Sequence, residues 1–196
     1  MQQESELLDQ SLRGDAQAFS MLVSLYQRPV YNMCYRMLGN VQEAEDAAQE
    51  TFLRAYRALK SFDPKRKFAT WLLSIAANYC IDQHRKRRIT QVDMEAVSAG
   101  EFRAAGKGSE ARMIDFEAGE AIQDLLATLG PKERAALILH YWYDYSYKEI
   151  SKELSLSESA VKSRMHRARK ELAEKMQFSA TQGLDLERRQ HEAAAI

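Results

Sequence analysis

The spacing of apolar residues constrains this chain more than any other feature, because large apolar side chains recur every three or four positions along most of it. Within residues 15–26 they stand at Phe19, Leu22, Val23 and Tyr26, which is the stripe of an amphipathic helix. No stretch of useful length alternates apolar and polar residues as a β-strand would. The sequence therefore predicts an all-α fold.

The first 90 residues are expected to form a four-helix bundle, with helices over residues 15–26, 30–38, 41–59 and 68–88. Gly39 suits the left-handed end of a helix, and Asn40 followed by Glu43 has the spacing of a capping box. Pro64 marks residues 61–67 as a loop. We expect these helices to pack into one compact domain, residues 1–90.

A second helical domain is expected over residues 115–177. Between residues 91 and 114 the periodicity disappears and glycines appear, so this segment is predicted to be a flexible linker. Apolar spacing resumes near Phe116, and Pro131 after Gly130 suits the first turn of a further helix. Residues 178–196 are predicted to be a polar, frayed tail.

The second domain contains a predicted helix-turn-helix. Ser146 and Glu149 have capping-box spacing at the start of one helix, and Ser157 caps the next after a three-residue turn. In the second helix Val161 and Met165 fall inward, which puts a set of polar and cationic side chains outside: Lys162, Ser163, His166, Arg167 and Lys170, with Arg164 and Arg169 on the flanks. Such a helix suits the major groove of DNA, although a charged surface hairpin is the alternative.

Charge is distributed unevenly although 28 Lys and Arg balance 28 Asp and Glu. Residues 62–90 carry seven basic side chains against two acidic ones, and residues 157–175 carry six against three. Two basic segments in acidic surroundings indicate a polyanionic partner. Solvated helix faces are the alternative.

Two features of the first domain also suggest binding. Asp46, Gln49, Glu50 and Leu53 share one face of the predicted helix 41–59, which could dock a basic partner helix or simply be solvated. Basic residues stand at both ends of the helix 68–88, and Asn78 lies midway, where its amide could bind an exposed base or merely lie on the surface. Trp71, on the same helix, is interpreted as a core residue.

Several classes of protein are disfavoured. Cys34 and Cys80 make neither a disulfide framework nor a zinc quartet, so they are expected to be buried packing residues in a reducing cytoplasm. No apolar run approaches the roughly 20 residues of a membrane helix, and no secretory signal is present. The histidines show no ligand spacing and no glycine-rich phosphate loop occurs, so a metal-dependent nuclease is the weaker hypothesis. We expect no catalytic residue, no metal, no cofactor and no small-molecule substrate.

Three stretches together resemble the bacterial sigma factors of the extracytoplasmic-function type, also called group 4. These are Asp46-Ala-Ala-Gln-Glu-Thr-Phe-Leu-Arg-Ala-Tyr56, residues 68–79, and residues 145–169. The resemblance covers about residues 10–90 and 116–176 and looks closest to the branch that serves cell-envelope stress in Gram-positive bacteria. It implies a non-catalytic subunit that directs RNA polymerase to promoters.

The resemblance also implies roles for individual residues. Those expected to dock on the clamp helices of the largest polymerase subunit are Asp46, Gln49, Glu50, Leu53 and Arg54. Those expected to bind the −10 element are Lys65, Arg66, Lys67, Asn78, Arg85 and Arg88. Those expected to read the −35 element are Lys162, Ser163, Arg164, His166 and Arg167. His166 departs from the aromatic or aliphatic residue common there, which leaves the −35 preference open.

The partners implied by the resemblance are core RNA polymerase, through its clamp helices and its flap, promoter DNA, and a membrane-anchored anti-sigma factor. The chain is then expected in the cytoplasm, near the membrane only when the anti-sigma factor holds it. The alternative function is an autonomous helix-turn-helix regulator that acts without polymerase. That alternative accounts for residues 132–175 but gives no role to Asp46, Glu50 or Asn78.

Overall fold

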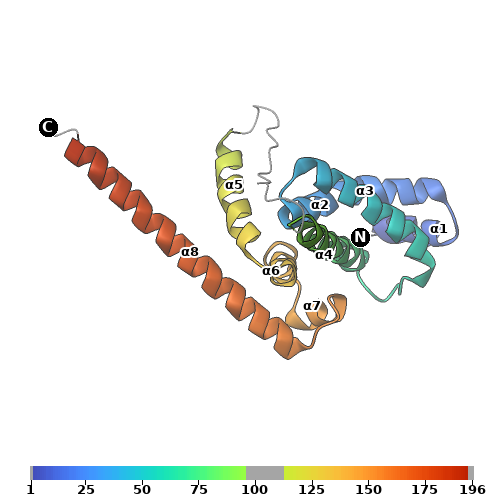
Figure 1. Ribbon diagram of the computed structural model, residues 1–196. Coiled ribbons are helices and arrows are strands. Elements are labelled where there is room, and N and C mark those ends of the chain that lie inside the picture. Colours follow the sequence, from blue (N-terminus) through green and yellow to red (C-terminus); the bar gives the residue numbers. More distant parts are fainter. Residues whose placement is uncertain (1, 96–112, 194–196) are drawn as a thin grey trace.

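The computed structural model describes residues 2–95 and 113–193, with side chains from 4 to 87 and from 121 to 176. Every regular element in these ranges is a helix, so the all-α prediction is confirmed (Figure 1). Along the chain the elements are α1 (Gln2–Leu12), α2 (Ala16–Leu38), α3 (Val41–Ala58), the 3-10 turn η1 (Leu59–Ser61), α4 (Phe68–Glu95), α5 (Met113–Thr128), α6 (Pro131–Tyr143), α7 (Tyr147–Glu153) and α8 (Glu158–Ala193). No described helix is long and apolar enough to cross a membrane.

Two helices of the first domain differ from the prediction. α2 is one helix of 23 residues that passes through Pro29, where two separate helices were expected. A proline removes one backbone donor, but the next residues on the inner face, Val30, Met33 and Cys34, are fully buried, so packing carries the helix through. α1 was not predicted, and its Glu4 accepts a hydrogen bond of 2.6 Å from the Tyr26 hydroxyl of α2.

The ends of the helices mostly follow the predicted signals. Gly39 has a φ of 75° and ends α2 in the left-handed conformation. Asn40 accepts from the backbone N–H of Glu43 at 3.0 Å, but the Glu43 carboxylate pairs with Arg87 of α4 rather than completing a capping box. At the start of α7 both halves of the box with Ser146 are present.

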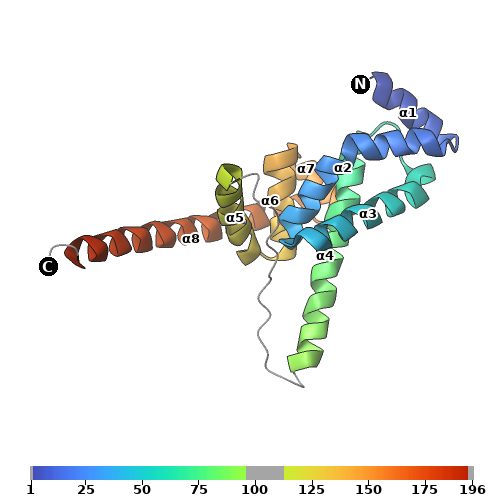
Figure 2. The same cartoon turned by 90° about the horizontal axis from the view of Figure 1, so that it is seen from above.

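The two predicted domains share one hydrophobic core, which the sequence did not predict. α6 packs against α7 and α8 on one side and against α2 and α4 on the other (Figures 1 and 2). Six consecutive residues of α6, 134–139, are buried, whereas a surface helix would bury only a stripe. The helix-turn-helix domain is therefore docked on the first domain through α6.

Two helices continue into ranges predicted to be irregular. α4 extends to Glu95, past the predicted linker boundary at residue 91, and the rest of that linker, residues 96–112, lies outside the described residues. α8 continues to Ala193, where a frayed tail was expected, because residues 178–193 contain no proline and mostly good helix formers. In Figure 1 α8 projects well away from the rest of the molecule.

Candidate functional site

The predicted docking face of α3 lies on the surface. Asp46, Gln49 and Leu53 are exposed, and Leu53 keeps 52% of its surface in contact with solvent. Glu50 and Arg54 form an ion pair of 2.8 Å one helical turn apart, and this hydrogen bond lowers the pKa of Glu50. The Arg54 guanidinium also lies over the Tyr79 ring of α4, 4.6 Å from its centroid.

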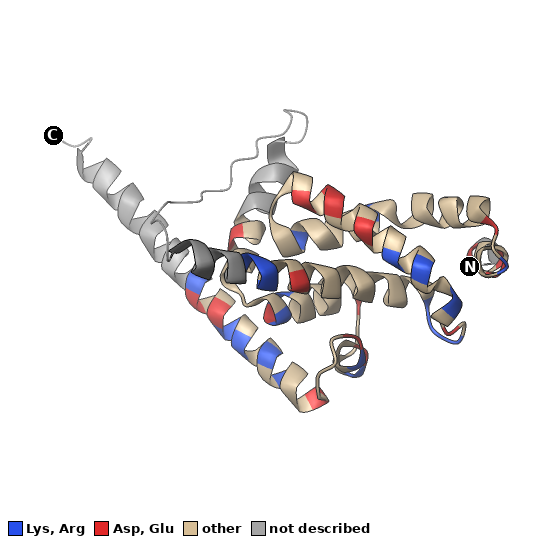
Figure 3. Cartoon of the chain, turned by 45° about the vertical axis from the view of Figure 1, so that its right-hand side comes forward, with Lys and Arg blue, Asp and Glu red and all other residues tan. Residues whose placement is uncertain are grey.

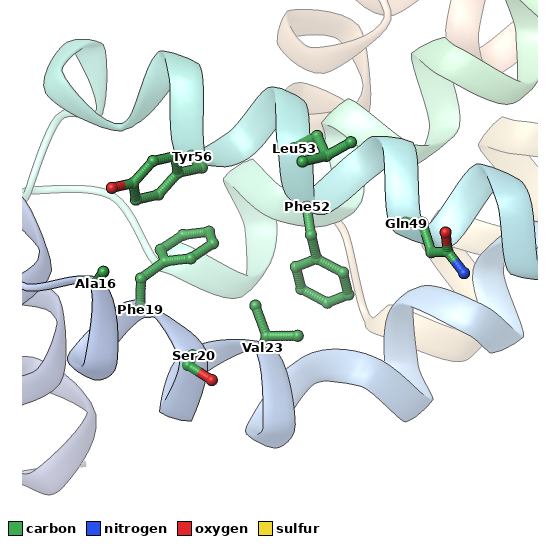
Figure 4. A pocket seen from close by; sticks show the side chains of 8 residues that line it. All are labelled: Ala16, Phe19, Ser20, Val23, Gln49, Phe52, Leu53 and Tyr56. Carbon is green, nitrogen blue, oxygen red and sulfur yellow. The ribbon is translucent and has the colours of Figure 1, made fainter.

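An apolar groove that the sequence analysis missed runs beside this face, between α2 and α3 (Figure 4). It has a volume of about 630 Å³ and is lined by Ala16, Phe19, Ser20, Val23, Gln49, Phe52, Leu53 and Tyr56. The rings of Phe19 and Tyr56 lie 4.9 Å apart, and Tyr56 is 47% exposed. The sequence did contain a signal for this groove. The predicted helix 41–59 carries large apolar side chains on two faces, whereas a helix that packs against the core on one face needs only one apolar stripe.

The loop before α4 is fixed by an aromatic cluster. The rings of Phe62, Phe68 and Trp71 lie 5.1–5.6 Å apart, and all three are buried, which confirms the core interpretation of Trp71. The Asp63 carboxylate accepts from the Lys65 N–H at 3.0 Å and tightens the turn. The predicted −10 cations Lys65 and Lys67 are exposed on this loop.

Asn78 and Arg66 meet the helix-turn-helix instead of standing free. The Asn78 amide donates to the backbone carbonyl of Glu153, at the end of α7, at 3.0 Å. The Arg66 guanidinium donates to the carboxylate of the same Glu153. Sequence reasoning could not find these contacts, because they join residues 75 and 87 positions apart.

The cations toward the end of α4 are less well defined as a cluster. Arg85 is exposed and lies 3.2 Å from Asp82 on the same helix. Arg87 is engaged by Glu43 of α3. The Arg88 side chain, also predicted to bind DNA, lies outside the described side chains. Arg85, which is 71% exposed, is thus the predicted −10 cation at this end whose side chain the structure describes.

The outward face of α8 carries most of the predicted −35 residues. Val161, Met165 and Ala168 are fully buried, which confirms the predicted phasing of the helix. Opposite them a row of exposed side chains follows: Lys162, Ser163, His166 and Arg167. Figure 3 shows several basic positions, along with some acidic ones, on this part of α8.

Arg164 differs from its neighbours on α8. Its guanidinium turns toward α6 and lies 2.5 Å from a carboxylate oxygen of Glu133, and Arg167 lies 3.2 Å from the same oxygen. Arg164 is only 25% exposed, whereas Arg167 is 63% exposed. Arg164 is therefore placed to anchor α8 on α6, and Arg167 keeps most of its surface for a ligand.

The two cysteines are buried next to each other, as expected for packing residues. Cys34 of α2 and Cys80 of α4 are both free thiols. A hydrogen bond with Cys34 together with burial raises the pKa of the Cys80 thiol. A raised pKa keeps the thiol protonated, which makes it a poor nucleophile and a poor metal ligand.

Known protein families match both halves of the chain. Residues 22–89 match the Sigma-70 region 2 family, and residues 119–172 match the Sigma-70 region 4 family. The chain is 38% identical over 177 residues to the ECF RNA polymerase sigma factor SigW of Bacillus subtilis, a match that covers 86% of this chain and 94% of SigW. It is 32% identical to the RNA polymerase sigma-H factor of Pseudomonas aeruginosa, over 90% of this chain and 95% of that protein.

A solved structure has the same fold. The sigma factor RpoE from Bartonella quintana, determined in complex with the anti-sigma factor NepR, matches with a TM-score of 0.63. The match covers 83% of this chain and 98% of RpoE, at 23% identity. The likeness extends across both helical domains.

Proposed function

Because this chain belongs to the extracytoplasmic-function sigma factors, we propose that it binds core RNA polymerase through α3, the −10 element through the start of α4, and the −35 element through α8. Its function is that of an alternative sigma factor, a promoter-specificity subunit in transcription initiation. Specificity of this kind requires recognition and no bond chemistry, so we infer that the chain itself is not a catalyst.

The proposed docking site combines charge with apolar surface. Asp46 and Glu50 present carboxylates to a basic partner helix, and the groove beside them offers Leu53 and Tyr56 to an apolar side chain of that helix. Covering the exposed half of one leucine side chain contributes about 1 kcal/mol. An amphipathic helix with cations beside an apolar stripe fits this site best.

The proposed −10 site is built for an exposed base and its backbone. The Asn78 side chain can pair with the edge of an adenine, and Lys65 and Lys67 can hold nearby phosphates. Pulling a base out of the stack costs a few kcal/mol. This site therefore requires that core polymerase first binds the promoter duplex and holds it against the site.

The proposed −35 site lies on the outward row of α8. Lys162 and Arg167 can donate to guanine O6 and N7, while Ser163 can donate or accept. A few such contacts bind weakly at physiological salt, because phosphate contacts weaken steeply as salt rises. When core polymerase holds both DNA-binding surfaces on one promoter, binding at one element raises the effective concentration of the second surface at the other element. Two weak contacts then give selective binding.

One observation carries this proposal: a single chain exposes an acidic and apolar face on α3 and a separate cationic row on α8. The test compares one variant from each surface, Glu50→Ala and Lys162→Ala. We expect Glu50→Ala to weaken binding to purified core polymerase whatever the promoter, and Lys162→Ala to leave that binding intact while lowering run-off transcription from promoters with a −35 element. A Glu50→Ala protein that competes normally for core polymerase contradicts the docking site.

We further propose a cytoplasmic protein held inactive by an anti-sigma factor and released by envelope stress. The structural relative bound to NepR supports the first part of this proposal, and the similarity to SigW supports the class of factor. Pull-down with the membrane fraction of the source cells, before and after stress, tests it. Equal recovery in both conditions contradicts regulated release.

A further inference from the structure

Glu133 of α6 is an acceptor shared by two arginines of α8. Its Oε1 accepts a hydrogen bond of 2.5 Å from the Arg164 guanidinium and one of 3.2 Å from the Arg167 guanidinium. The Glu133 side chain is only 19% exposed. Charge-assisted bonds of this kind are strong and directional, so the carboxylate is a fixed point beside the outward row of α8.

Gly130, directly before α6, leaves the space that this carboxylate occupies. A methyl group on Gly130 would lie 2.7 Å from Glu133 Oε2, which is too close for two atoms that are not bonded. The φ of Gly130 is −58°, a value that any residue adopts. Glycine is therefore needed here for the room it gives Glu133 and not for its backbone conformation.

The two arginines use the shared carboxylate differently. Arg164 is 25% exposed, and Arg167 is 63% exposed. A guanidinium carries five N–H donors in one plane. Arg167 gives one of these donors to Glu133, and that bond restricts the directions in which the remaining donors can point. Arg164 thus joins two helices, whereas Arg167 presents oriented donors to solvent.

Lys162, the other residue proposed to donate to guanine, is not held in this way. It is exposed and has no ion pair with any residue that the structure describes. An ammonium group on a flexible stem acts as a point charge, whereas a planar guanidinium can match two acceptors at once. The outward row therefore combines one free cation and one oriented cation.

We propose that Glu133 is a positioning residue for base recognition. It holds the Arg167 guanidinium in an orientation that the O6 and N7 atoms of guanine can accept, and it thereby sets selectivity at one base pair of the −35 element. A donor that is already oriented loses less conformational entropy on binding. This inference rests on the −35 role proposed above for Arg167.

A purely electrostatic role of Glu133 would have the opposite sign. A carboxylate beside DNA repels phosphates, so its removal would strengthen binding to every sequence. Loss of a positioning residue instead lowers the preference for one base pair. The two roles can therefore be separated by comparing templates that differ at single base pairs.

The test measures run-off transcription by core polymerase with the full-length factor. The templates are a promoter that the wild-type factor starts and derivatives of it with single base-pair changes across the −35 element. Discrimination is the ratio of transcript from the unchanged template to transcript from a changed one. Arg167→Ala identifies the base pair that Arg167 recognises, as the one where discrimination is lost. Glu133→Ala is the test variant, and Glu174→Ala removes the same side chain from a site on α8 that is 66% exposed.

We expect Glu133→Ala to lower discrimination about fivefold at the base pair that Arg167 recognises, since ordering a side chain on binding has a cost of that size. At the other base pairs, and in Glu174→Ala, the change should be less than about twofold. In an Arg167→Ala background, Glu133→Ala should cause no further loss there. An equal loss at every −35 base pair, or more transcript from every template, would overturn the proposal.

Gly130→Ala keeps the proposal testable if Glu133→Ala does not fold. It retains the Glu133 charge but forces the carboxylate to move, so we expect a loss of about two- to threefold at the same base pair. Unchanged discrimination in Gly130→Ala would overturn the positioning role. If Arg167→Ala discriminates as wild type does at every −35 base pair, the proposed −35 role falls and this inference with it. If Arg167→Ala loses discrimination and Glu133→Ala keeps it, only this inference falls.

Discussion

His84 is a half-buried residue of α4 whose protonation affects the contact between α4 and the end of α2. Its Nε2 lies 2.7 Å from the carbonyl oxygen of Met37, which can only accept, so that nitrogen carries the hydrogen. Burial lowers the pKa of His84, and the nearby charge of Arg134 acts in the same direction, although the hydrogen bond opposes them. The neutral ring is therefore the form that the fold favours.

A pH prediction follows from this depressed pKa. As pH falls below about 6.5, the unfolded chain takes up a proton on His84 before the folded chain does, so the free energy of unfolding decreases. His84→Gln keeps a side-chain donor and cannot titrate there. Between pH 7 and pH 5 we expect the urea midpoint of His84→Gln to fall less than that of wild type. An equal fall in both proteins would contradict the role of His84.

Asn78 gives a prediction about promoter melting. Asn78→Ala removes the amide proposed to hold a flipped base, an interaction of about 1–3 kcal/mol. With core polymerase we expect permanganate reactivity of the melted −10 region to fall about tenfold or more, while closed-complex binding to duplex promoter, measured at a temperature too low for melting, changes little. An equal loss in both measurements would argue against a base pocket at Asn78.

The limits of sequence reasoning are clearest at Asn78. Its position midway along a helix between basic ends was predictable from the chain, because helix period and charge are local properties. Its engagement by Glu153 was not, because that contact depends on how two distant helices meet. Arg164 is similar: its flank position was predicted, but its ion pair with Glu133 required the placement of α6.

Individual elements followed the sequence wherever the signal was local. The caps at Gly39, Ser146 and Ser157 and the inward phase of α8 all agree with the structure. α2 did not, because burial of Val30 and Met33 outweighs the missing donor of Pro29. Local rules thus predicted these caps but not how far α4 and α8 extend, and packing decided that α2 continues through Pro29.

The junction of α2 and α3 permits a prediction with a matched control. Gly39 has a φ of 75°, and a methyl group there would lie 3.3 Å from the amide nitrogen of Gln123, which donates to the carbonyl of Tyr35. Gly14 has a φ of 98° with nothing within 4 Å. We expect Gly39→Ala to lower the free energy of unfolding by about 1–2 kcal/mol and Gly14→Ala by about 1 kcal/mol, measured by denaturant titration.

A greater cost at Gly39 would identify the contact with Gln123 as the difference between the two sites. Gly39→Asn should recover part of the loss, because asparagine tolerates the left-handed conformation. Equal losses for both alanine variants would mean that Gln123 adjusts freely and that only backbone strain matters.

The molecule as a whole is expected to unfold in one transition, because both domains share one core. Ile138 of α6 is fully buried within that core. Ile138→Ala should lower the free energy of unfolding by about 2–5 kcal/mol and weaken hydrogen-exchange protection in α2 and α4 as well as in α6. The control Ile122→Ala changes a residue that is 43% exposed and should have little effect. Unchanged protection in α2 and α4 would show two independently stable domains.

Two carbonyl groups at the end of α2 accept hydrogen bonds from both the first domain and the helix-turn-helix domain, and they affect the cost of separating these two domains. Met37 receives one donor from His84 of its own half and one from Arg134 of the other, at 2.6 Å. Tyr35 likewise receives the Gly39 N–H and the Gln123 amide. When the halves part, each oxygen keeps its local donor, and Arg134 keeps the Leu129 carbonyl. Separation of the domains would leave neither oxygen without a donor, so its cost lies mainly in exposing the apolar residues of the shared core.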